Sequence, residues 1–340
     1  MDIGFLFERL AGMGIPGVAV MLLILAGLMW LLMRGADWLV EGAAQLAYGL
    51  KIPKIIVGAT VVSLGTTMPE AAVSVVSAVG GDAGLALGNA IGSVICDTGL
   101  VFGIGCLMTG LPVDRFIMNR HGWLQFGFVL LLSVLIVAAF VSGGVPTLTR
   151  QVGIMFLILL GGYFAISIVW AKQHPLVSEE MEPRTISVGR CCVMLFFGSA
   201  IVLITSELLV ADVKQICVML SIPQSIVSAT VVAFGTSLPE LVTAITCIRQ
   251  RHPELLVGNI LGADILNILF VIGVSAAASP MIIPREVLFL HVPAMVLIVG
   301  IFRFASSVSG TQFNRAWGIP LLAGYVLFTV CAFVFGVQAH

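Results

Sequence analysis

Long apolar runs separated by short polar or charged segments make up most of the chain. A helix needs about 20 mainly apolar residues to cross the hydrocarbon core of a bilayer. Charged residues and turn signals divide the runs into segments of this length, and the pattern predicts ten membrane-spanning helices. The fold class is therefore expected to be an all-α polytopic membrane protein. The predicted spans are residues 18–47, 53–80, 84–109, 121–142, 148–171, 190–215, 222–248, 254–278, 286–304 and 315–337.

The composition excludes an ordinary water-soluble domain. Hydrophobic residues make up 59% of the 340 residues and charged residues only 10%, whereas soluble domains contain about 25% charged residues. The formal net charge is -1, and no basic tail or charged run indicates nucleic-acid binding. Residues 1–17 lack the features of a cleaved signal peptide, so the first apolar run is expected to stay as a span. The expected surroundings are a lipid bilayer, and no required protein partner is indicated.

Two segments of the chain repeat each other at an offset of 170 residues. Residues 50–70 (LKIPKIIVGATVVSLGTTMPE) match residues 220–240 (LSIPQSIVSATVVAFGTSLPE) at 13 of 21 positions. The same offset, without a gap, aligns residues 88–103 (GNAIGSVICDTGLVFG) with residues 258–273 (GNILGADILNILFVIG). Because both blocks share one offset, they belong to a single duplicated unit.

The duplication predicts two repeats of five spans each. Residues 1–171 hold the first repeat, residues 191–340 hold the second, and the polar segment 172–190 connects them. Because five is an odd number, the second repeat must enter the membrane from the opposite side, as in the inverted repeats of many secondary transporters. Assigning the loops alternately places eleven Lys and Arg on one side and four on the other. By the positive-inside rule, the connector is predicted to be cytoplasmic and both termini to lie outside.

A glutamate lies near the middle of one predicted span in each repeat, at Glu70 and Glu240. Burying a carboxylate at this depth costs about 2.5–3.5 kcal/mol on insertion scales. No Lys or Arg within the spans matches either glutamate, so a bound cation is the expected partner. The equivalent positions predict one shared role for the pair.

The residues before each glutamate favour a broken helix at the bilayer midplane. Pro69 and Pro239 cannot donate the helical hydrogen bond. A proline alone is commonly a simple kink in a membrane helix, but the duplicated Gly-Thr-(Thr/Ser)-x-Pro-Glu sequence places the break beside a carboxylate twice. Irregular backbone at this depth is tolerated where it lines a cavity, and hard cations such as calcium take about six to eight oxygens. Besides the freed carbonyls, the predicted oxygen ligands are the hydroxyls of Thr66, Thr67, Thr236 and Ser237.

The second repeated block supplies further polar side chains within apolar spans. Ser93 and Asp97 are one helical turn apart and so face the same way. Glycines at four-residue spacing in both blocks favour close helix packing. The candidate cation-binding residues of this block are Asn89, Ser93, Asp97, Asn259, Asp264 and Asn267.

At these motifs the chain resembles the calcium/cation antiporter superfamily and is most similar to prokaryotic sodium/calcium exchangers. The family's repeats carry GTS-x-PE followed by GN-x-x-GS and a later Asn or Asp. This chain has GTTMPE with GNAIGSVICD, and GTSLPE with GNILGADILN. The similarity covers both repeats, the ten-span layout and the connector, hence most of the chain. It implies an antiporter, not an enzyme, that exchanges sodium for calcium by alternating access, without a cofactor, in a prokaryotic inner membrane.

Residue roles follow from the same resemblance. It implies that Glu70 and Glu240 are the principal calcium ligands, with Thr66 and Thr236 beside them. It also implies that the first and sixth spans slide past the core helices during transport. The residues implied to line the adjoining sodium sites are Thr67, Ser237, Ser93, Asp97 and Asn267.

Three positions depart from the family's pattern. Ala263 stands where Ser is common and lacks its hydroxyl, Asp97 stands where Asn is common, and Asp264 adds a charge where Asn is frequent. The stoichiometry and the identity of the transported ions therefore stay open at this point.

Three alternatives remain. A proton-coupled calcium or cation exchanger has the same architecture, although such relatives usually carry a Glu in the second motif, where this chain has Gly92 and Gly262. A distant alternative is an intramembrane aspartyl-type hydrolase with Asp97 and Asp264 as its carboxylate pair, but these positions are not equivalent under the offset. A transport-inactive scaffold is disfavoured by the intact liganding groups in both repeats.

Overall fold

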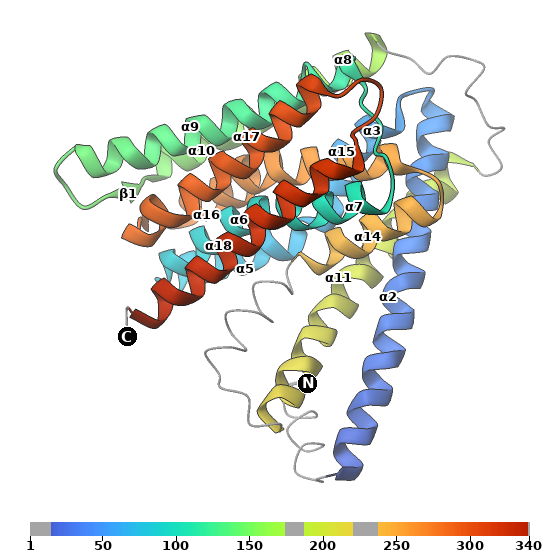
Figure 1. Cartoon of the computed structure of the whole chain (residues 1–340), viewed down its shortest axis with the longest axis horizontal. Helices are drawn as coiled ribbons and strands as arrows, with labels where there is room; N and C mark the ends of the chain where they lie inside the picture. The colour runs from blue at the N-terminus through green and yellow to red at the C-terminus, as the bar shows by residue number, and fades with distance from the viewer. Residues whose placement is uncertain (1–14, 174–186, 220–236, 339–340) are drawn as a thin grey trace.

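The structure is a computed structural model, and it describes residues 15–173, 187–219 and 237–338 (Figure 1). Among these residues η1, η2, η5 and η6 are π-helical turns and η7 is a 3-10 turn. The first part of the chain forms α2 (Ile15–Leu50), α3 (Lys54–Val57), η1 (Gly58–Val62), α4 (Ser63–Thr66), α5 (Met68–Val79), α6 (Ala83–Cys96), η2 (Asp97–Val101), α7 (Phe102–Met108), α8 (Arg115–Met118), α9 (His121–Val141), β1 (Thr147–Leu148) and α10 (Arg150–Gln173). The second part forms α11 (Val188–Met219), α14 (Leu238–Arg249), α15 (Pro253–Leu266), η5 (Asn267–Ile272), α16 (Gly273–Ala278), β2 (Met281–Ile282), η6 (Val287–His291), α17 (Val292–Val308), η7 (Arg315–Trp317) and α18 (Gly318–Gln338).

The predicted spans agree with the helices to within a few residues. Within the described residues, eight helical segments are long and apolar enough to cross a membrane, and the bent pair Lys54–Thr66 and Met68–Val79 makes a ninth. The predicted span 222–248 falls partly outside the described residues, which resume before α14. Apart from the two-residue strands β1 and β2, the described regular structure is helical. The prediction of an all-α membrane protein is confirmed.

The duplication is visible in the helix bounds. Met68–Val79 and Leu238–Arg249 coincide under the 170-residue offset, as do Ala83–Cys96 and Pro253–Leu266. Each copy of the second block then passes into a π-helical turn at the equivalent residue, and η2 and η5 begin at the offset positions. The two repeats therefore share local backbone geometry. This includes the π-helical turn, which the pattern of apolar residues does not predict.

Helices α2 and α11 form a pair that lies across the stack of the other helices (Figure 1). Glycines allow their backbones to approach closely. A side chain at Gly198 would meet the backbone of Leu39 at 2.7 Å and the carbonyl of Gly35 at 2.9 Å. Small residues at such a crossing support van der Waals packing where no hydrophobic driving force acts between helices.

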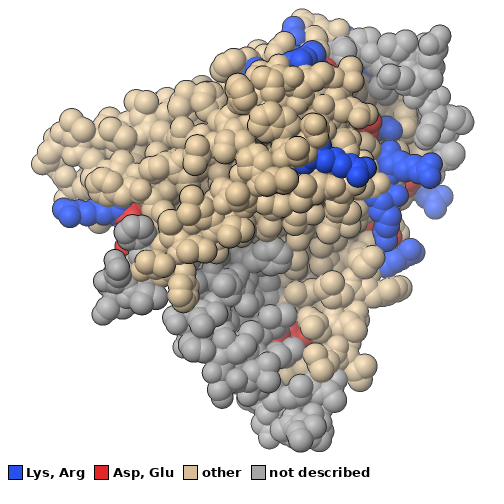
Figure 2. All heavy atoms as spheres, viewed as in Figure 1, with Lys and Arg blue, Asp and Glu red and all other residues tan. Residues whose placement is uncertain are grey.

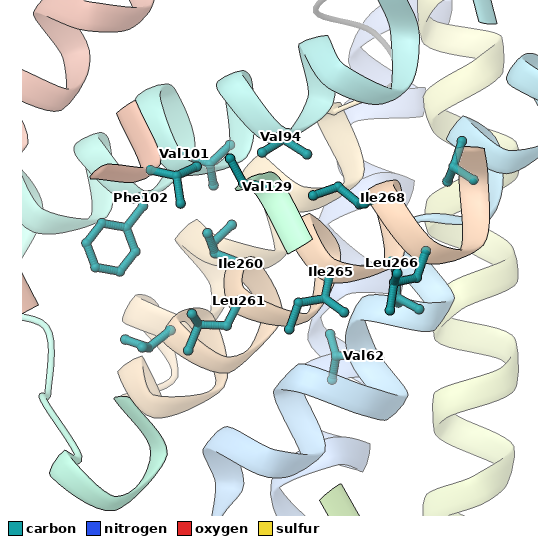
Figure 3. Packing of buried hydrophobic residues seen from close by; sticks show 14 of the residues in the cluster. Val62, Val94, Val101, Phe102, Val129, Ile260, Leu261, Ile265, Leu266 and Ile268 are labelled. Atoms are coloured by element: carbon teal, nitrogen blue, oxygen red, sulfur yellow. The ribbon is translucent and has the colours of Figure 1, made fainter. Parts of the chain in front are cut away.

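Helix α15 occupies the centre of the molecule. Every residue from Leu255 to Leu266 is buried, which explains why this segment is apolar all round rather than amphipathic. Figure 3 shows its isoleucine and leucine side chains between Val62 of η1 on one side and Val94 and Val129 on the other. The second block of the second repeat thus packs against the broken span of the first repeat.

Two glycines set the distance between α15 and that broken span. A Cβ atom at Gly258 would collide with the carbonyl of Ile55, and one at Gly262 would collide with the carbonyl of Ala59 and the hydroxyl of Ser63. The expectation that the four-residue glycine spacing serves close packing is confirmed for Gly258 and Gly262. The backbones touch, and no side chain would fit between them.

The outer surface fits a lipid environment. Large apolar side chains are exposed on several helices, including Leu23, Val76, Ile158 and Phe289. In the view of Figure 2, most of the visible Lys and Arg gather at the end of the molecule near α3 and α8, and a surface with few charged residues separates them from a smaller group at the opposite end. Such a charge-poor band between charged ends is typical of a membrane-spanning protein.

The close approach at Gly262 predicts a destabilising effect of the smallest side chain. Gly262→Ala would force the Ala59 carbonyl and the Ser63 hydroxyl apart, at about 1–3 kcal/mol for an overpacked core. We expect the melting temperature of the purified protein in detergent to fall by several degrees. Gly161→Ala is the matched control, because Gly161 in α10 is exposed with nothing within 4 Å of its added Cβ. Equal melting temperatures for the two variants would contradict the packing assignment.

Candidate cation site

The break in the second span places Glu70 at the start of a helix. Helix α4 ends at Thr66, α5 begins at Met68, and their axes differ by 45°. Pro69 lies in the first turn of α5 and has no N–H for the carbonyl of Gly65, which it would bond in an uninterrupted helix. Glu70 therefore lies in the first turn of α5, where the helix dipole favours a negative charge.

The second repeat places Glu240 in the same way. Helix α14 begins at Leu238, with Pro239 and Glu240 in its first turn and Ser237 as the preceding residue. Its N-terminus also favours a carboxylate. The candidate ligand Thr236 lies outside the described residues, so its predicted role stays a prediction.

Four fully buried carboxylates gather around these two helix starts. Glu240 interacts electrostatically with Glu70, and Glu70 with Asp97. Asp97 also interacts with Glu240 and with Asp264. None of the four side chains is accessible to solvent, and within the described part of the chain no Lys or Arg contributes to their electrostatic surroundings. The cluster therefore brings together four groups that can each carry a negative charge, with no compensating Lys or Arg among the described residues.

The hydrogen bonding around this cluster is incomplete. Buried polar atoms in native proteins are nearly always paired, and exceptions mark strained or functional sites or positions for an ordered water or an ion. Here both carboxylate oxygens of Glu70, Asp97 and Glu240 lack a hydrogen-bond partner within the described residues. The same holds there for Thr67 Oγ1, Ser237 Oγ, Thr243 Oγ1, Asn259 Nδ2, Asp264 Oδ1, Gln125 Oε1 and both side-chain polar atoms of Asn267.

Two predicted hydroxyl ligands lie beside the glutamates. The side chain of Ser93 interacts with Glu70, and that of Thr66 interacts with Glu240. The Thr66 hydroxyl also donates to Asn259 Oδ1 at 3.4 Å, which links the broken span to α15. These contacts bring residues of both repeated blocks and of both repeats to one place.

Asn89 has a supporting position. Its side-chain amide donates to the backbone carbonyl of Glu70 at 3.1 Å and to the hydroxyl of Ser74 at 2.9 Å. The Ser74 hydroxyl in turn donates to the carbonyl of Ala86 at 3.1 Å. These bonds tie α6 to the first turns of α5 and so fix the backbone that carries the Glu70 carboxylate.

The later polar residues of the second block begin the two π-helical turns. Asp97 is the first residue of η2, and Asn267 is the first residue of η5. Single π-helical turns within α-helices occur frequently at functional sites because they redirect side chains and loosen backbone bonds. Both side chains are buried and without hydrogen-bond partners among the described residues.

Two residues near the cluster were not found from the sequence. The hydroxyl of Thr98 and the side-chain amide of Gln125 both donate to Asp264 Oδ2. Gln125 lies in α9, outside both repeated blocks of the sequence. Comparison of the two blocks therefore gives no reason to choose it. A single buried Gln in an apolar span was the available signal.

The acidic residues of the first and sixth spans lie elsewhere. Asp37 in α2 pairs with Arg249 at the end of α14, and it also accepts from Gln250 Nε2 at 3.0 Å. Glu207 in α11 is exposed. Neither residue contributes to the electrostatic surroundings of the four clustered carboxylates.

The chemistry of the cluster suits a hard cation. Its atoms are carboxylate, hydroxyl and amide oxygens, which calcium and sodium prefer over nitrogen or sulfur. Within the described residues, no three His, Cys, Asp or Glu side chains converge closely enough to hold a metal ion by themselves. A cation at the two glutamates would therefore need hydroxyl and backbone carbonyl oxygens as well, which the broken helix supplies.

Comparison with known proteins connects this site to a family. A family profile described as "Sodium/calcium exchanger protein" matches residues 19–169 and 191–334. The chain is 30% identical over 313 residues to the inner membrane protein YrbG of Escherichia coli, covering 90% of this chain and 94% of that protein. It is 26% identical over 352 residues to the sodium/calcium exchanger MaX1 of Methanosarcina acetivorans, covering 92% and 98%.

Solved structures agree with these matches. The sodium-calcium exchanger NCX_Mj, soaked with 2.5 mM Na+ and 10 mM Sr2+, superimposes with a TM-score of 0.76 at 27% identity, over 90% of this chain and 97% of that chain. The same exchanger soaked with zero Na+ and Ca2+ gives a TM-score of 0.77 over 91% and 98%.

The two bonds from Asn89 predict a supporting role rather than direct ligation. Asn89→Asp keeps the shape and adds an oxygen but removes both N–H donors, so the Glu70 carbonyl and the Ser74 hydroxyl lose a partner at about 1–3 kcal/mol. We expect a lower melting temperature and weaker divalent-cation binding by the purified protein. Asn119→Asp, at an exposed helix end, is the control. Tighter cation binding by Asn89→Asp would instead identify an oxygen ligand.

Proposed function

Because the chain belongs to the sodium/calcium exchanger family and is a cation/calcium exchanger of this family, we propose that it couples sodium movement to calcium movement in opposite directions. Glu70 and Glu240 together form the central calcium site. The observation that carries this proposal is the pair of fully buried carboxylates with no Lys or Arg among the described residues to neutralise them. An ion supplies the missing partner and neutralises the charge that burial would otherwise penalise.

The surrounding oxygens divide between calcium and sodium positions. Thr66 contributes next to Glu240, and Thr236 contributes at the equivalent place in the second repeat. Flanking sodium positions use the hydroxyl, carboxylate and amide groups that border the two glutamates. These flanking residues are Thr67, Ser93, Asp97, Ser237 and Asn267, with Asn259 and Asp264 adjoining them and Asn89 in support.

Alternating access follows from the duplicated architecture. Inverted repeats allow one bundle to move against the other around a site at the midplane. The α2–α11 pair lies across the helices that carry the cluster, which supports movement of this pair relative to them. We place the chain in an inner membrane with the connector 172–190 cytoplasmic and both termini outside, and the basic end near α3 and α8 supports that orientation.

Coupling to protons is the second candidate. A proton-coupled exchanger would use the same two glutamates. Proton-coupled relatives usually carry a further Glu in the second motif. At Gly262 the carbonyl of Ala59 and the hydroxyl of Ser63 leave no room for a side chain, whereas an added Cβ at Gly92 would meet nothing within 4 Å, so packing disfavours a further acidic side chain at Gly262 alone. Hydrolysis by Asp97 and Asp264 is excluded as the function, since the family consists of transporters and not enzymes.

Removing either central charge is expected to stop transport. Glu70→Gln and Glu240→Gln keep the shape but lose one carboxylate each, so calcium flux into proteoliposomes should fall at least tenfold while the protein still assembles. Asp82→Asn is the matched control, because Asp82 is an exposed N-cap residue and Asn caps helices equally well. Wild-type exchange in either glutamine variant would refute the central site.

The driving ion can be identified independently. In proteoliposomes loaded with radioactive calcium, external sodium chloride should release calcium many times faster than choline chloride at constant pH. An imposed pH gradient at constant sodium should have little effect. Release that follows the pH gradient and ignores sodium would establish the proton-coupled alternative instead.

A further inference from the structure

Two arginines lie close together at the C-terminal end of α17. Arg115, in α8, donates to the backbone carbonyls of Ser306 and Ser307 at 3.2 and 3.1 Å and to the carbonyl of Ser309. Arg303, in the last turns of α17, interacts electrostatically with Arg115. Neither arginine forms an ion pair with a described Asp or Glu. Two like charges therefore face each other at this end of the helix.

The hydrogen bonding of this cluster is incomplete. Arg303 is 8% exposed and Ser309 is 7% exposed, although both are polar. Arg303 Nη1 donates to Ser306 Oγ at 2.5 Å, but Arg303 Nε has no partner among the described residues, and neither has the Ser309 hydroxyl. Buried polar atoms are nearly always paired. The unused groups are an arginine N–H and a hydroxyl, which both donate to an anion.

The described surroundings offset little of the positive charge. Both guanidinium groups stay ionised, because arginine does not lose its proton in proteins. The C-terminus of α17 supplies the equivalent of about half a negative charge, which the bonds from Arg115 use. Asp114 precedes Arg115 in the chain, but it caps α8 by accepting from the Ile117 N–H at 3.1 Å. A bound anion would offset the remaining charge.

The cluster borders the lipid-facing surface of the protein. The Arg303 guanidinium lies over the ring of Trp123, 4.3 Å from its centroid, and Trp123 is exposed. Tryptophan is enriched where a membrane meets water. From Trp123 the exposed apolar face of α9 continues through Leu130 and Val134. The arginines belong to the basic end of the molecule near α8 (Figure 2), so charged donors and an apolar face adjoin each other here.

We propose that Arg303, Arg115 and the Ser309 hydroxyl bind the phosphate of an anionic phospholipid headgroup, whose acyl chains lie along the exposed face of α9. Guanidinium groups match pairs of phosphate oxygens, and anionic lipids give the cytoplasmic leaflet its negative surface. A lipid fits better than a free phosphate ion, because Trp123 and the apolar face of α9 adjoin the donors. Arg303 is not among the electrostatic contacts of the four clustered carboxylates, so the proposal is independent of which ions are exchanged.

The site is tested by counting the lipids that stay bound. The purified full-length protein in neutral detergent is mixed with equal amounts of phosphatidylglycerol and phosphatidylcholine that carry identical acyl chains, and mass spectrometry of the intact complexes counts the lipids. We expect about one phosphatidylglycerol per chain and several-fold less phosphatidylcholine. Equal retention of the two lipids would overturn the proposal, because only phosphatidylglycerol carries a net negative charge.

A melting-temperature arm distinguishes a lipid from a free anion. Phosphatidylglycerol should raise the melting temperature of the detergent-solubilised protein by several degrees, and phosphatidylcholine should not. Inorganic phosphate, compared with chloride at equal ionic strength and pH, should have no such effect. Equal stabilisation by inorganic phosphate without added lipid would assign a free-anion site and overturn the lipid assignment.

Variants connect the retained lipid to this position. Arg303→Gln removes the charge and should lower phosphatidylglycerol retention about tenfold, as expected for lost bonds to a charged group. Ser309→Ala removes one donor, should weaken retention several-fold, and keeps the test valid if Arg303→Gln fails to fold. Arg190→Gln is the matched control, because Arg190 is an exposed arginine at the start of α11. Equal retention by the wild type and both site variants, or an equal loss in the control, would overturn the proposal.

Calcium-45 binding in the same samples separates this proposal from the proposed function. Arg303→Gln should lose phosphatidylglycerol and still bind calcium, whereas Glu70→Gln should lose calcium and still retain phosphatidylglycerol. Calcium binding that persists in Glu70→Gln would reject the central site and leave the lipid site standing. Loss of phosphatidylglycerol from Glu70→Gln to the same extent as from Arg303→Gln would instead reject a separate lipid site.

Discussion

The buried carboxylates of Glu70 and Glu240 constrain the rest of the structure. Each is fully buried, and no described Lys or Arg lies in its electrostatic surroundings, in a part of the molecule where an uncompensated charge is strongly unfavourable. The surrounding structure reduces this cost in two ways: both residues begin helices, where the dipole favours a negative charge, and both lie among oxygens suited to a cation. In the proposed function, a bound cation supplies the remaining compensation.

Backbone irregularities make this arrangement possible. The break before Met68 frees carbonyl oxygen at the depth of the carboxylates, and the π-helical turns η2 and η5 begin at Asp97 and Asn267. Glycine-mediated contact between α15 and the broken span then keeps both irregular regions packed inside protein. Irregular backbone within a membrane needs such burial, so the packing and the site depend on each other.

Much of this could be predicted from the sequence, because apolar length, the proline and the duplicated glutamates are local signals. The helix bounds and the buried positions of Glu70 and Glu240 agree with those signals. The π-helical turns were not predictable, since they are set by packing between helices. The bonds from Thr98 and Gln125 to Asp264 join residues separated by 166 and 139 positions, and no periodicity within one segment encodes such contacts.

Among the described residues, the ion pair between Asp37 and Arg249 has no equivalent at the positions 170 residues away. At an offset of 170 residues Asp37 corresponds to Glu207, but Arg249 corresponds to Val79, which cannot pair with it. If each repeat adopted the conformation of the other during alternating access, this contact would break and no equivalent contact would form. Exposed ion pairs contribute about 0.2–1 kcal/mol, enough to change a two-state ratio by up to about fivefold. A contact formed in one state alone would bias the resting protein toward that state even before any ion gradient is applied.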